Sequence, residues 1–243
     1  LHAQGFRIIM DVVYNHTYSL DSWFQRTVPW YFYRVNEDGT ASNGSACGND
    51  VASEREMCAK YILESVLYWA QEYHMDGFRF DLMGLLDVDL MNRIRAALDE
   101  RYGKGEKILF GEPWAADRTA MEQEKEQALK QNIHNLDKNT GMFCDNTRDA
   151  IKGSALELKE PGFVNGAPGM ETEILNSVRA WCGGDGPSGA KAPSQIITYV
   201  SSHDNQTLWD KLSETTTDEE LRKREYRLAA GIYMTCQGRL FLL

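Results

Sequence analysis

Six short apolar runs, separated mostly by longer segments of helical period, limit what this chain can fold into. Alternation of this kind predicts βα repeats around a parallel sheet. The runs lie at 6–13, 75–81, 107–111, 142–145, 196–200 and 239–243. The 243 residues are close to the roughly 250 of one (β/α)8 barrel, so we expect one domain rather than two.

Four of the connecting segments predict helices, at 52–72, 88–102, 118–131 and from Thr217 onward. Asp50 or Ser53 can cap the first of these helices and Asp87 the second, because short polar side chains accept hydrogen bonds from a helix's first N–H groups. Thr217, with Glu220 three residues later, matches a capping box. The third segment is so rich in Glu, Lys and Gln that it predicts a largely solvated helix.

Charge and hydropathy exclude two classes of partner. A formal net charge of -10, with no basic stripe to offset it, argues against binding to a phosphate backbone. No segment approaches the roughly 20 apolar residues that span a bilayer. Five cysteines show no CxxC pair or zinc-ligand spacing and predict buried thiols, which leaves a cytoplasmic and a secreted location both open.

Polar residues come after the apolar runs at four points, beginning with the segment 8–17. There Asp11 interrupts a run that we expect to be buried on both faces, and Asn15 and His16 follow at its exit. A buried aspartate needs polar partners. Asp11 fits a structural brace for a neighbouring loop as well as it fits a role in a site.

The second segment, 76–84, separates two kinds of side chain by strand alternation. Phe78 and Phe80 share one face, and Arg79 and Asp81 share the other. We expect the phenylalanines to face helices and the charged pair to point into the barrel near its C-terminal end. An arginine two residues away favours the ionised form of Asp81, as a nucleophile requires.

The third and fourth segments also place polar residues at strand exits. In 107–114 an apolar strand ends at Glu112, and Trp114 follows; apolar surroundings favour the protonated form of a carboxyl, which suits a proton donor. In 197–205 the strand delivers His203, Asp204 and Asn205. A single carboxyl at a strand end is more often a helix cap or a solvated loop residue. Four such segments in one chain favour a catalytic site.

A long loop at about 18–50 contains many aromatic side chains. Aromatic faces stack on pyranose rings, but a small satellite core under a long loop accounts for such residues equally well. Both interpretations stay open at this point.

At the four polar segments the sequence resembles the alpha-amylase superfamily, through DVVYNH, DGFRFDLMG, GEPW and YVSSHDN in that order. Within it the chain is similar to type I pullulanases, on the evidence of YNHT, SNGSACGNDVASER at 42–55 and DNTRDAIKG at 145–153. One departure is Pro113, where many relatives have glycine after the glutamate.

The resemblance implies a retaining hydrolase of alpha-1,6 branch linkages in pullulan and amylopectin. It makes Asp81 the nucleophile, Glu112 the acid/base and Asp204 the stabiliser of the transition state. It further implies that sugar is bound by His16, Arg79, His203, Trp114, Asn49, Asp50 and Asn205, with Asp11 and Asn15 structural near the site and Trp209 and Asp210 close to the cleft. An alpha-1,4-acting amylase, an isoamylase-like debranching enzyme and a non-catalytic glucan-binding barrel remain alternatives.

The same resemblance predicts an incomplete (β/α)8 TIM barrel in which 1–243 is a partial catalytic domain holding strands three to eight. Both ends look cut, so we expect the first two strands to be missing and the segment by itself to be inactive. No cofactor is required and no metal site is predicted, although Asp11, Asn15, Asp38 and Asp50 leave calcium open. The expected partner is an alpha-glucan, bound by an enzyme that is monomeric at full length.

Overall fold

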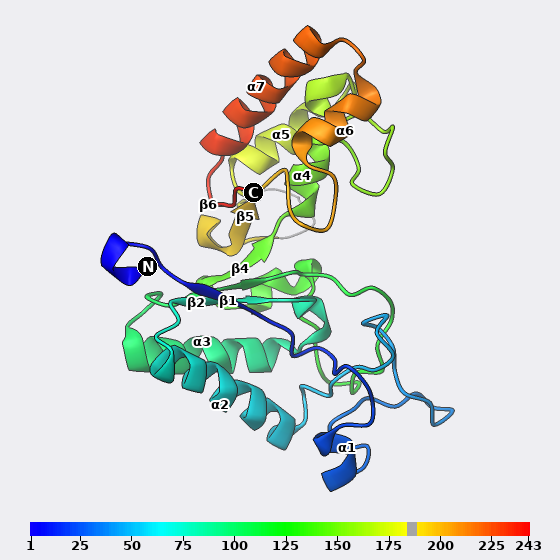
Figure 1. Cartoon of the computed structure of the whole chain (residues 1–243), viewed down its shortest axis with the longest axis vertical. Helices are drawn as coiled ribbons and strands as arrows, with labels where there is room; N and C mark the ends of the chain where they lie inside the picture. Colours follow the sequence, from blue (N-terminus) through cyan, green and yellow to red (C-terminus); the bar gives the residue numbers. More distant parts are fainter. Residues whose placement is uncertain (184–188) are drawn as a thin grey trace. The chain divides into compact units, whose positions relative to one another are not determined.

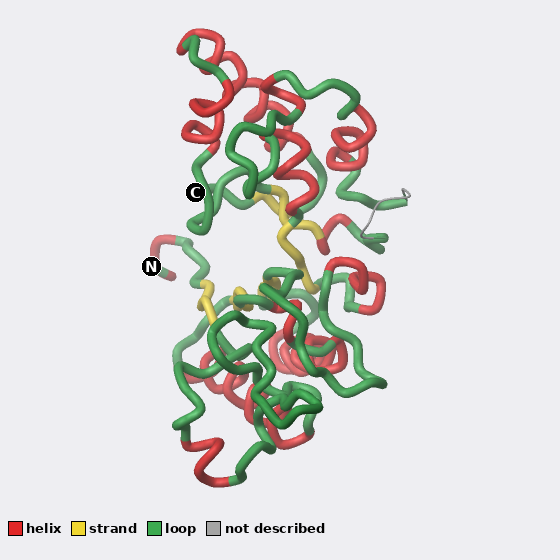
Figure 2. The backbone as a smooth tube through the Cα atoms, turned by 90° about the vertical axis from the view of Figure 1, so that its right-hand side faces the viewer, coloured by secondary structure: helices red, strands yellow, loops and turns green. Residues whose placement is uncertain are grey.

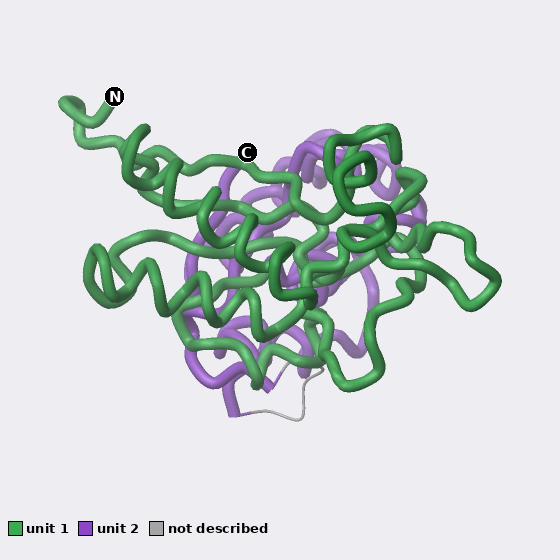
Figure 3. Tube along the Cα trace, turned by 90° about the horizontal axis from the view of Figure 1, so that it is seen from below, with its two compact units in different colours: residues 1–142 green, residues 143–243 purple. Residues whose placement is uncertain are grey.

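The computed structural model describes residues 1–183 and 189–243 of the chain, which divide into two compact units (Figures 1 and 3). Unit 1 is Leu1–Met142 and unit 2 is Phe143–Leu243. Loops make up much of both units (Figure 2).

Unit 1 is built on parallel strands, as predicted. The strands are β1 (Ile9–Val12), β2 (Gly77–Phe80), β3 (Ile108–Gly111) and β4 (Thr140–Phe143), whose last residue begins unit 2. β1 pairs with β2, β2 with β3 and β3 with β4, all in parallel. The register aligns Asp11 with Arg79 and Phe80 with Gly111. The polar residues that come after these strands therefore leave the sheet at one edge.

Helices α2 (Glu56–Glu72) and α3 (Val88–Tyr102) lie on one face of these strands (Figure 1). Asp87 caps α3 as predicted, accepting a hydrogen bond from the Leu90 amide at 2.9 Å. α2 starts four residues later than predicted, and neither Asp50 nor Ser53 caps it. Both side chains have other partners, because Ser53 donates to Asp87 and Asp50 accepts from the 42–45 loop.

The predicted helix at 118–131 is wrong. Apart from a short 3-10 helix, η3 (Lys130–Asn135), this segment is an irregular loop. Its backbone pairs with distant segments instead: the Ala120 amide donates to Ser42 Oγ, and the Ala128 amide donates to the Leu86 carbonyl. A polar helix without an apolar face gains little from packing, so these contacts outweigh its helix propensity.

The expectation that Asp11 is buried is also wrong. Its side chain is 58% exposed, because β1 shows an exposed and half-buried pattern until Val12. The apolar run predicted a strand that is covered by other segments on both faces. In unit 1, β1 pairs with β2 along one of its edges. Asp11 still has a charged partner, the guanidinium of Arg79 at 2.9 Å.

The 18–50 loop contains one short helix, α1 (Trp23–Thr27), and a small aromatic cluster. Phe24 stacks on Phe32 with ring centroids 4.6 Å apart and meets the edge of Tyr61 on α2 at 4.9 Å. Tyr33 is fully buried, whereas Tyr18 is fully exposed. The satellite-core interpretation therefore holds for the cluster, and the solvent-facing rings remain available for other contacts.

Unit 2 holds the other two predicted strands and, among its described residues, four α-helices. The elements are α4 (Asp145–Lys152), α5 (Glu171–Val178), β5 (Ile196–Thr198), α6 (Leu208–Thr215), α7 (Glu219–Thr235) and β6 (Arg239–Leu240). β5 pairs with β6 in parallel. A core cluster joins Ile151 of α4, Val200 after β5, Leu208 of α6 and Tyr233 of α7. Asp218, one residue after the predicted Thr217, caps α7.

Short 3-10 helices complete the described elements, at η1 (His2–Gln4), η2 (Met83–Leu85), η4 (Phe163–Asn165) and η5 (Pro193–Gln195). In the part of the chain that the structure describes, no helix has the length and apolar character needed to cross a bilayer. The five cysteine thiols are all free, and Cys58 and Cys144 are buried as predicted while Cys47 is exposed.

Unit 2 buries two lysines whose ammonium groups bond only to backbone carbonyl oxygens in the contacts seen. Lys152 donates to the Gln206 carbonyl at 2.9 Å, and Lys211 donates to the carbonyls of Glu157 and Leu158. Burial, helped by the charge of Arg148, lowers the pKa of Lys152 to about 8. The folded state therefore favours the neutral amine more than the unfolded state does.

This shift predicts a pH-dependent difference between wild type and Lys152→Met. Between pH 8 and the ordinary lysine pKa the unfolded chain binds more protons, so the free energy of unfolding rises with pH. From pH 7 to pH 9.5, chemical denaturation should show wild type gaining about 2 kcal/mol relative to the variant. A difference that is independent of pH would contradict the lowered pKa.

Candidate functional site

The site in unit 1 begins at the end of β2, where strand alternation orients the side chains as predicted. Phe78 and Phe80 are fully buried, and the Tyr14 and Phe80 rings lie 5.9 Å apart. Arg79 and Asp81 belong to the opposite face. The Asp81 amide donates to the Val12 carbonyl at 3.0 Å, so the first residue after β2 is still tied to β1.

Arg79 joins three carboxylates. Its Nη1 donates to Asp81 Oδ1 at 3.0 Å and to Asp11 Oδ1 at 2.9 Å, and its Nη2 donates to Glu112 Oε1. Burial would lower the pKa of Arg79, but Glu112, Asp11 and Asp81 outweigh it and raise the pKa. The guanidinium therefore stays charged, and its planar fork brings the carboxyl groups of Asp81 and Glu112 together.

Glu112 is almost completely buried, with 5% of its side chain exposed, against 27% for Asp81. Its second oxygen, Oε2, accepts a hydrogen bond from the Leu82 amide at 2.8 Å. Its backbone bonds to the same segment, from the Glu112 amide to the Phe80 carbonyl and from the Gly84 amide to the Glu112 carbonyl. Both carboxylate oxygens of Glu112 therefore accept hydrogen bonds, which the apolar surroundings predicted from the sequence did not include.

Leu82, the residue after Asp81, has φ of 38° in the left-handed region, which is unusual for leucine. Such strain costs on the order of 1 to 3 kcal/mol and persists only where its surroundings enforce it. Here the strained turn directs the Leu82 amide at Glu112 and begins η2. Sequence periodicity offered no sign of this backbone donor.

Asn15 and His16 form a second layer beneath Asp81. Asn15 Nδ2 donates to the Asp81 carbonyl at 2.7 Å and to Asp81 Oδ2 at 3.0 Å, so Asp81 has a donor on each carboxylate oxygen. His16 Nδ1 lies 2.6 Å from Asn15 Oδ1. Because an amide oxygen only accepts, His16 carries a proton on Nδ1, which orients the ring.

Trp114, two residues after Glu112, lines a cavity of about 420 Å³, together with Pro113, Ala115, Asp117, Arg118, Gln127, Leu129, Lys130 and Gln131. η2 packs closely against this strand exit. A Cβ placed on Gly84 would lie 2.6 to 2.7 Å from backbone atoms of Trp114. The close contact between the segments after β2 and β3 therefore requires glycine at this position.

Replacing Gly84 by alanine should destabilise unit 1 by about 2 to 3 kcal/mol, because the clash is with backbone and cannot be relieved by a rotamer change. Gly231 on α7 is the matched control, since its added Cβ meets open space and alanine should stabilise the helix by about 0.5 to 1 kcal/mol. Chemical denaturation of both variants measures the two effects. Equal stability of Gly84→Ala and wild type would show that the contact is not tight.

Asn49 and Asp50 lie in a buried network rather than at the Arg79 cluster. Asp50 is fully buried and accepts hydrogen bonds from Ser42, Gly44, Ser45 and Thr119. Burial raises its pKa, but these donors outweigh burial and hold the pKa below its ordinary value. Asn49 exchanges two hydrogen bonds with the Thr17 backbone. All of these contacts are internal to the protein, so they support the loop and involve no exposed surface of Asp50.

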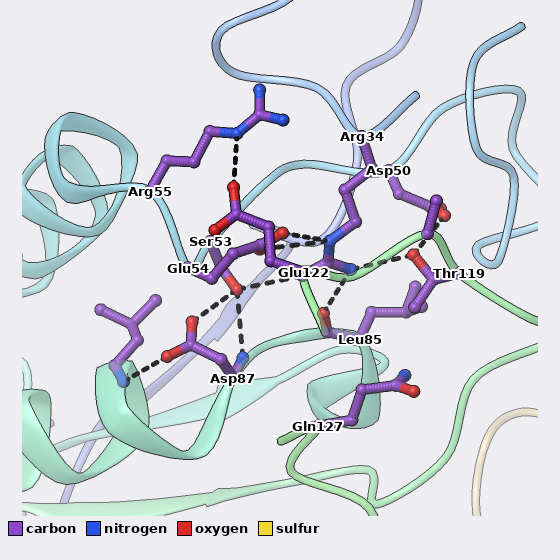
Figure 4. A network of polar contacts seen from close by, with 12 residues as sticks. Arg34, Asp50, Ser53, Glu54, Arg55, Leu85, Asp87, Thr119, Glu122 and Gln127 are labelled. Atoms are coloured by element: carbon purple, nitrogen blue, oxygen red, sulfur yellow. Dashed lines mark hydrogen bonds and ion pairs between the residues drawn. The ribbon is translucent and has the colours of Figure 1, made fainter. Parts of the chain in front are cut away.

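Arg34, which the sequence did not single out, is the centre of this network (Figure 4). It forms a fully buried ion pair with Glu54 at 2.8 Å and donates to the Leu85 carbonyl at 2.8 Å and to Thr119 Oγ1 at 3.0 Å. The contact to Leu85 attaches the 18–50 loop to η2, next to the segment that holds Glu112. In the sequence, the one indication of a role for Arg34 is its position directly after a run of aromatic residues in a long loop.

The fourth polar segment belongs to unit 2. His203, Asp204 and Asn205 come after β5 as predicted, and His203 Nε2 lies 3.1 Å from Asp204 Oδ1. Both side chains are more than half exposed. Trp209 and Asp210 lie on α6, where the Arg222 guanidinium lies over the Trp209 ring at 5.1 Å and Asp210 Oδ2 accepts from the hydroxyl of the capping Thr207.

The residues that left calcium open do not form a cation site. Asp11 pairs with Arg79, Asp38 accepts from Thr40 in a turn, and the carboxylate oxygens of Asp50 are taken by hydroxyl and amide donors. Within 1–183 and 189–243 no group of three or more acidic, histidine or cysteine side chains is arranged to hold a metal ion.

No protein-family model matches the chain. It is 42% identical to a pullulanase of Bacillus subtilis (strain 168) over all of its own length and 34% of that protein, and 30% identical to a pullulanase of Klebsiella aerogenes over 98% of its length and 26% of that protein. A rice protein named isoamylase 3 is 36% identical over 88% of the chain.

Solved structures agree with the sequence comparison. The chain matches the apo pullulanase of Paenibacillus barengoltzii with a TM-score of 0.92 and 43% identity, covering 99% of this chain and 37% of that one. It matches type I pullulanase of Bacillus subtilis in complex with maltose with a TM-score of 0.90 and 38% identity, over 99% and 34% of the two chains. The chain thus spans about a third of the length of these relatives. The predicted partial α/β barrel is confirmed by the parallel strands and by this match, and the chain is a homologue of the pullulanases.

Proposed function

We propose that residues 1–243 are part of the catalytic barrel domain of a retaining glycoside hydrolase that cleaves alpha-1,6 branch linkages in alpha-glucans. The observation that carries the proposal is the shared guanidinium of Arg79, which contacts both Asp81 and Glu112. A retaining enzyme needs two carboxyl groups about 5 to 5.5 Å apart, flanking one anomeric carbon. Two carboxylates that share one arginine fit this requirement.

In this mechanism Asp81 attacks the anomeric carbon while Glu112 gives its proton to the leaving glycosidic oxygen. Arg79 and Asn15 each donate to one oxygen of Asp81 and so hold its carboxylate for attack. A water molecule, deprotonated by Glu112, then hydrolyses the glycosyl-enzyme. Asp204 stabilises the positive charge that develops on the sugar ring.

The remaining predicted residues serve as sugar contacts in this proposal. His16 and His203 bind hydroxyl groups, Asn205 does the same after β5, and Trp114 stacks on a glucose ring at the wall of the cavity that it lines with Pro113. Asn49 and Asp50 act indirectly, through the loop they stabilise. The mechanism uses no cofactor, and its partner is an alpha-glucan chain bound by a monomer.

Homologues support the choice of substrate. Related pullulanases have been solved with maltohexaose and alpha-cyclodextrin, with maltotetraose and with maltotriose. An isoamylase-like activity is the second candidate, because of the likeness to rice isoamylase 3, but the pullulanases match more of the chain. Nothing in the Arg79 cluster by itself selects the 1,6 linkage over the 1,4 linkage.

Incubation of the complete protein with pullulan tests the proposal. Release of maltotriose is expected, because cleavage of the 1,6 bonds in pullulan leaves three-glucose units. Activity on amylose with none on pullulan would defeat the linkage assignment while preserving the hydrolase. Analysis of the anomeric form of the first product by NMR tests retention, and an inverted product would exclude Asp81 as a nucleophile.

A further inference from the structure

Helix α4 presents two buried cations to the chain after β5. Arg148 and Lys152 lie one turn apart on the helix and therefore share one face. Arg148 Nη1 bonds to the hydroxyl of Tyr199 at 3.0 Å, and its guanidinium lies 5.6 Å from the centre of that ring. Lys152 Nζ donates to the Gln206 carbonyl at 2.9 Å. The two cations thus contact the segment from Tyr199 to Gln206 near its two ends.

The two ends of this segment are fixed in the core of unit 2, but its middle is exposed. Val200 and Leu208 pack in the same cluster as Ile151 of α4, and Ser201 Oγ accepts from the Leu208 amide at 2.8 Å. Between these points, His203 and Asp204 are more than half exposed. The Lys152 contact is therefore a direct polar tie from α4 to the half of the segment that lies beyond Asp204.

Burying the ammonium group of Lys152 costs desolvation free energy, which a purely structural contact does not require. Its residue surface is 1% exposed, and a buried ammonium with a carbonyl partner is held far from water. The Gln206 side-chain oxygen, Oε1, is also buried without a partner among the described residues. An aliphatic side chain would fill the same space without this cost, but it could not hold the Gln206 carbonyl.

We propose that Lys152 is a positioning residue that fixes the 201–207 segment through the Gln206 carbonyl and so sets the place of Asp204 in the reaction. The proposal rests on the proposed function for the role of Asp204, but not for the tie itself. Lys152 touches no reacting atom in this arrangement; it acts through the backbone two residues after Asp204. Its loss should therefore lower kcat through Asp204 and raise KM through the proposed sugar contacts of His203 and Asn205, which belong to the same segment.

Lys211 provides a matched control. It is as deeply buried as Lys152, lies in the same unit and also donates to backbone carbonyls, but its partners are Glu157 and Leu158 in another loop. Lys152→Met and Lys211→Met each remove a buried ammonium group that donates to backbone carbonyls, although the carboxylates of Glu160 and Glu157 lie near Lys211. A general loss of stability affects both variants, whereas a local effect separates them.

Amide hydrogen exchange on the complete protein measures whether the Lys152 contact with the Gln206 carbonyl stabilises the segment, and it does not require activity. In Lys152→Met the Leu208 amide, which donates to Ser201 Oγ and so links the two ends of the segment, should exchange at least about 10-fold faster than in wild type. Lys211→Met should instead speed exchange of the Glu157 amide, which donates to Ser154 Oγ, and leave that of Leu208 unchanged. Lys152→Arg, which keeps an N–H donor, should restore part of the protection. Unchanged exchange of the Leu208 amide in Lys152→Met, or equal acceleration of it in both methionine variants, would overturn the proposal.

Kinetics on pullulan then test the link to catalysis. A displacement of about 1 Å costs on the order of 100-fold, so kcat of Lys152→Met should fall by about 10- to 100-fold and KM should rise, with both constants of Lys211→Met within about threefold of wild type. Faster exchange of the Leu208 amide with unchanged kcat would overturn the positioning role, while the Lys152 contact with the Gln206 carbonyl would still stabilise the segment. If wild type itself lacks activity on any alpha-glucan, the proposed function fails. The exchange result still decides whether Lys152 stabilises the segment through the Gln206 carbonyl.

Discussion

Asp81→Asn is expected to lower kcat on pullulan by about 10⁴-fold or more, because the amide cannot form the glycosyl-enzyme bond. The substitution is nearly isosteric, although the single carbonyl oxygen of the amide can accept from only one of the two donors, Arg79 or Asn15. Steady-state release of reducing ends measures the effect. The free energy of unfolding should change by much less than the loss in kcat implies.

Asp11→Asn is the control for that experiment. Asp11 contacts the same Nη1 atom of Arg79, at 2.9 Å, but its side chain is largely exposed. Removing its charge changes the electrostatics of Arg79 and leaves both reacting carboxylates in place. We expect a loss of less than about 10-fold. If Asp11→Asn lowered kcat as much as Asp81→Asn does, both losses would be explained by the altered electrostatics of Arg79, and Asp81 would not need to be a nucleophile.

Glu112→Gln is expected to lower kcat on pullulan by about 10²- to 10⁴-fold, the range that general acid catalysis contributes. The loss should depend on the leaving group. A sugar oxygen needs the proton from Glu112, whereas an activated aryl leaving group departs without it. An aryl alpha-glucoside of a maltooligosaccharide should therefore show a much smaller loss in its first turnover, followed by slow release of the glycosyl-enzyme.

This dependence on the leaving group separates the acid from the nucleophile. Asp81→Asn prevents formation of the glycosyl-enzyme from either substrate. The fold loss in rate should therefore be similar on pullulan and on the aryl substrate. If Glu112→Gln lost the same factor on both substrates, Glu112 would not be the proton donor, and its bond to Arg79 would have to be structural. Pre-steady-state kinetics with the aryl substrate give the two rates.

Arg79 connects these expectations to the fold. It is placed by β2, whose parallel neighbours β1 and β3 deliver Asp11 and Glu112 to the same edge of the sheet. The buried guanidinium pairs with carboxylates on three segments that are far apart in the sequence. Removing it would leave three carboxylates close together without their shared cation, which is destabilising because the carboxyl of Glu112 is almost completely buried. Arg79 therefore contributes to the fold and to the proposed chemistry at once.

The sequence was sufficient to predict the strands and the polar residues at their exits. All six predicted strands exist, and the residues after β2, β3 and β5 are the polar ones that the sequence indicated. The alternation of Phe78, Arg79 and Phe80 has a physical cause, since successive side chains of a strand point to opposite faces. The cap of α3 at Asp87 is equally local. The family resemblance rested on these same residues and is confirmed by the homologues.

Long-range contacts decided the rest, because local propensity is weaker than a specific set of tertiary hydrogen bonds. The 118–131 segment has strong helix formers, yet its amides bond to Ser42 and Leu86, which no local rule connects to it. Asp50 and Ser53 had the right chemistry to cap α2, but Thr119 and Asp87 take part in their hydrogen bonding instead. Asp11 is exposed because pairing and covering of β1 depend on which other segments reach it.

Strand period and apolar runs are local properties, so the residue types at the strand ends could be predicted without coordinates. Three features of the site could not: one guanidinium joins Asp81 and Glu112, the strained Leu82 directs its amide at Glu112, and Asp50 supports a loop. These features depend on atoms brought together from segments tens of residues apart. Their positions result from packing of the whole unit, which periodicity does not encode.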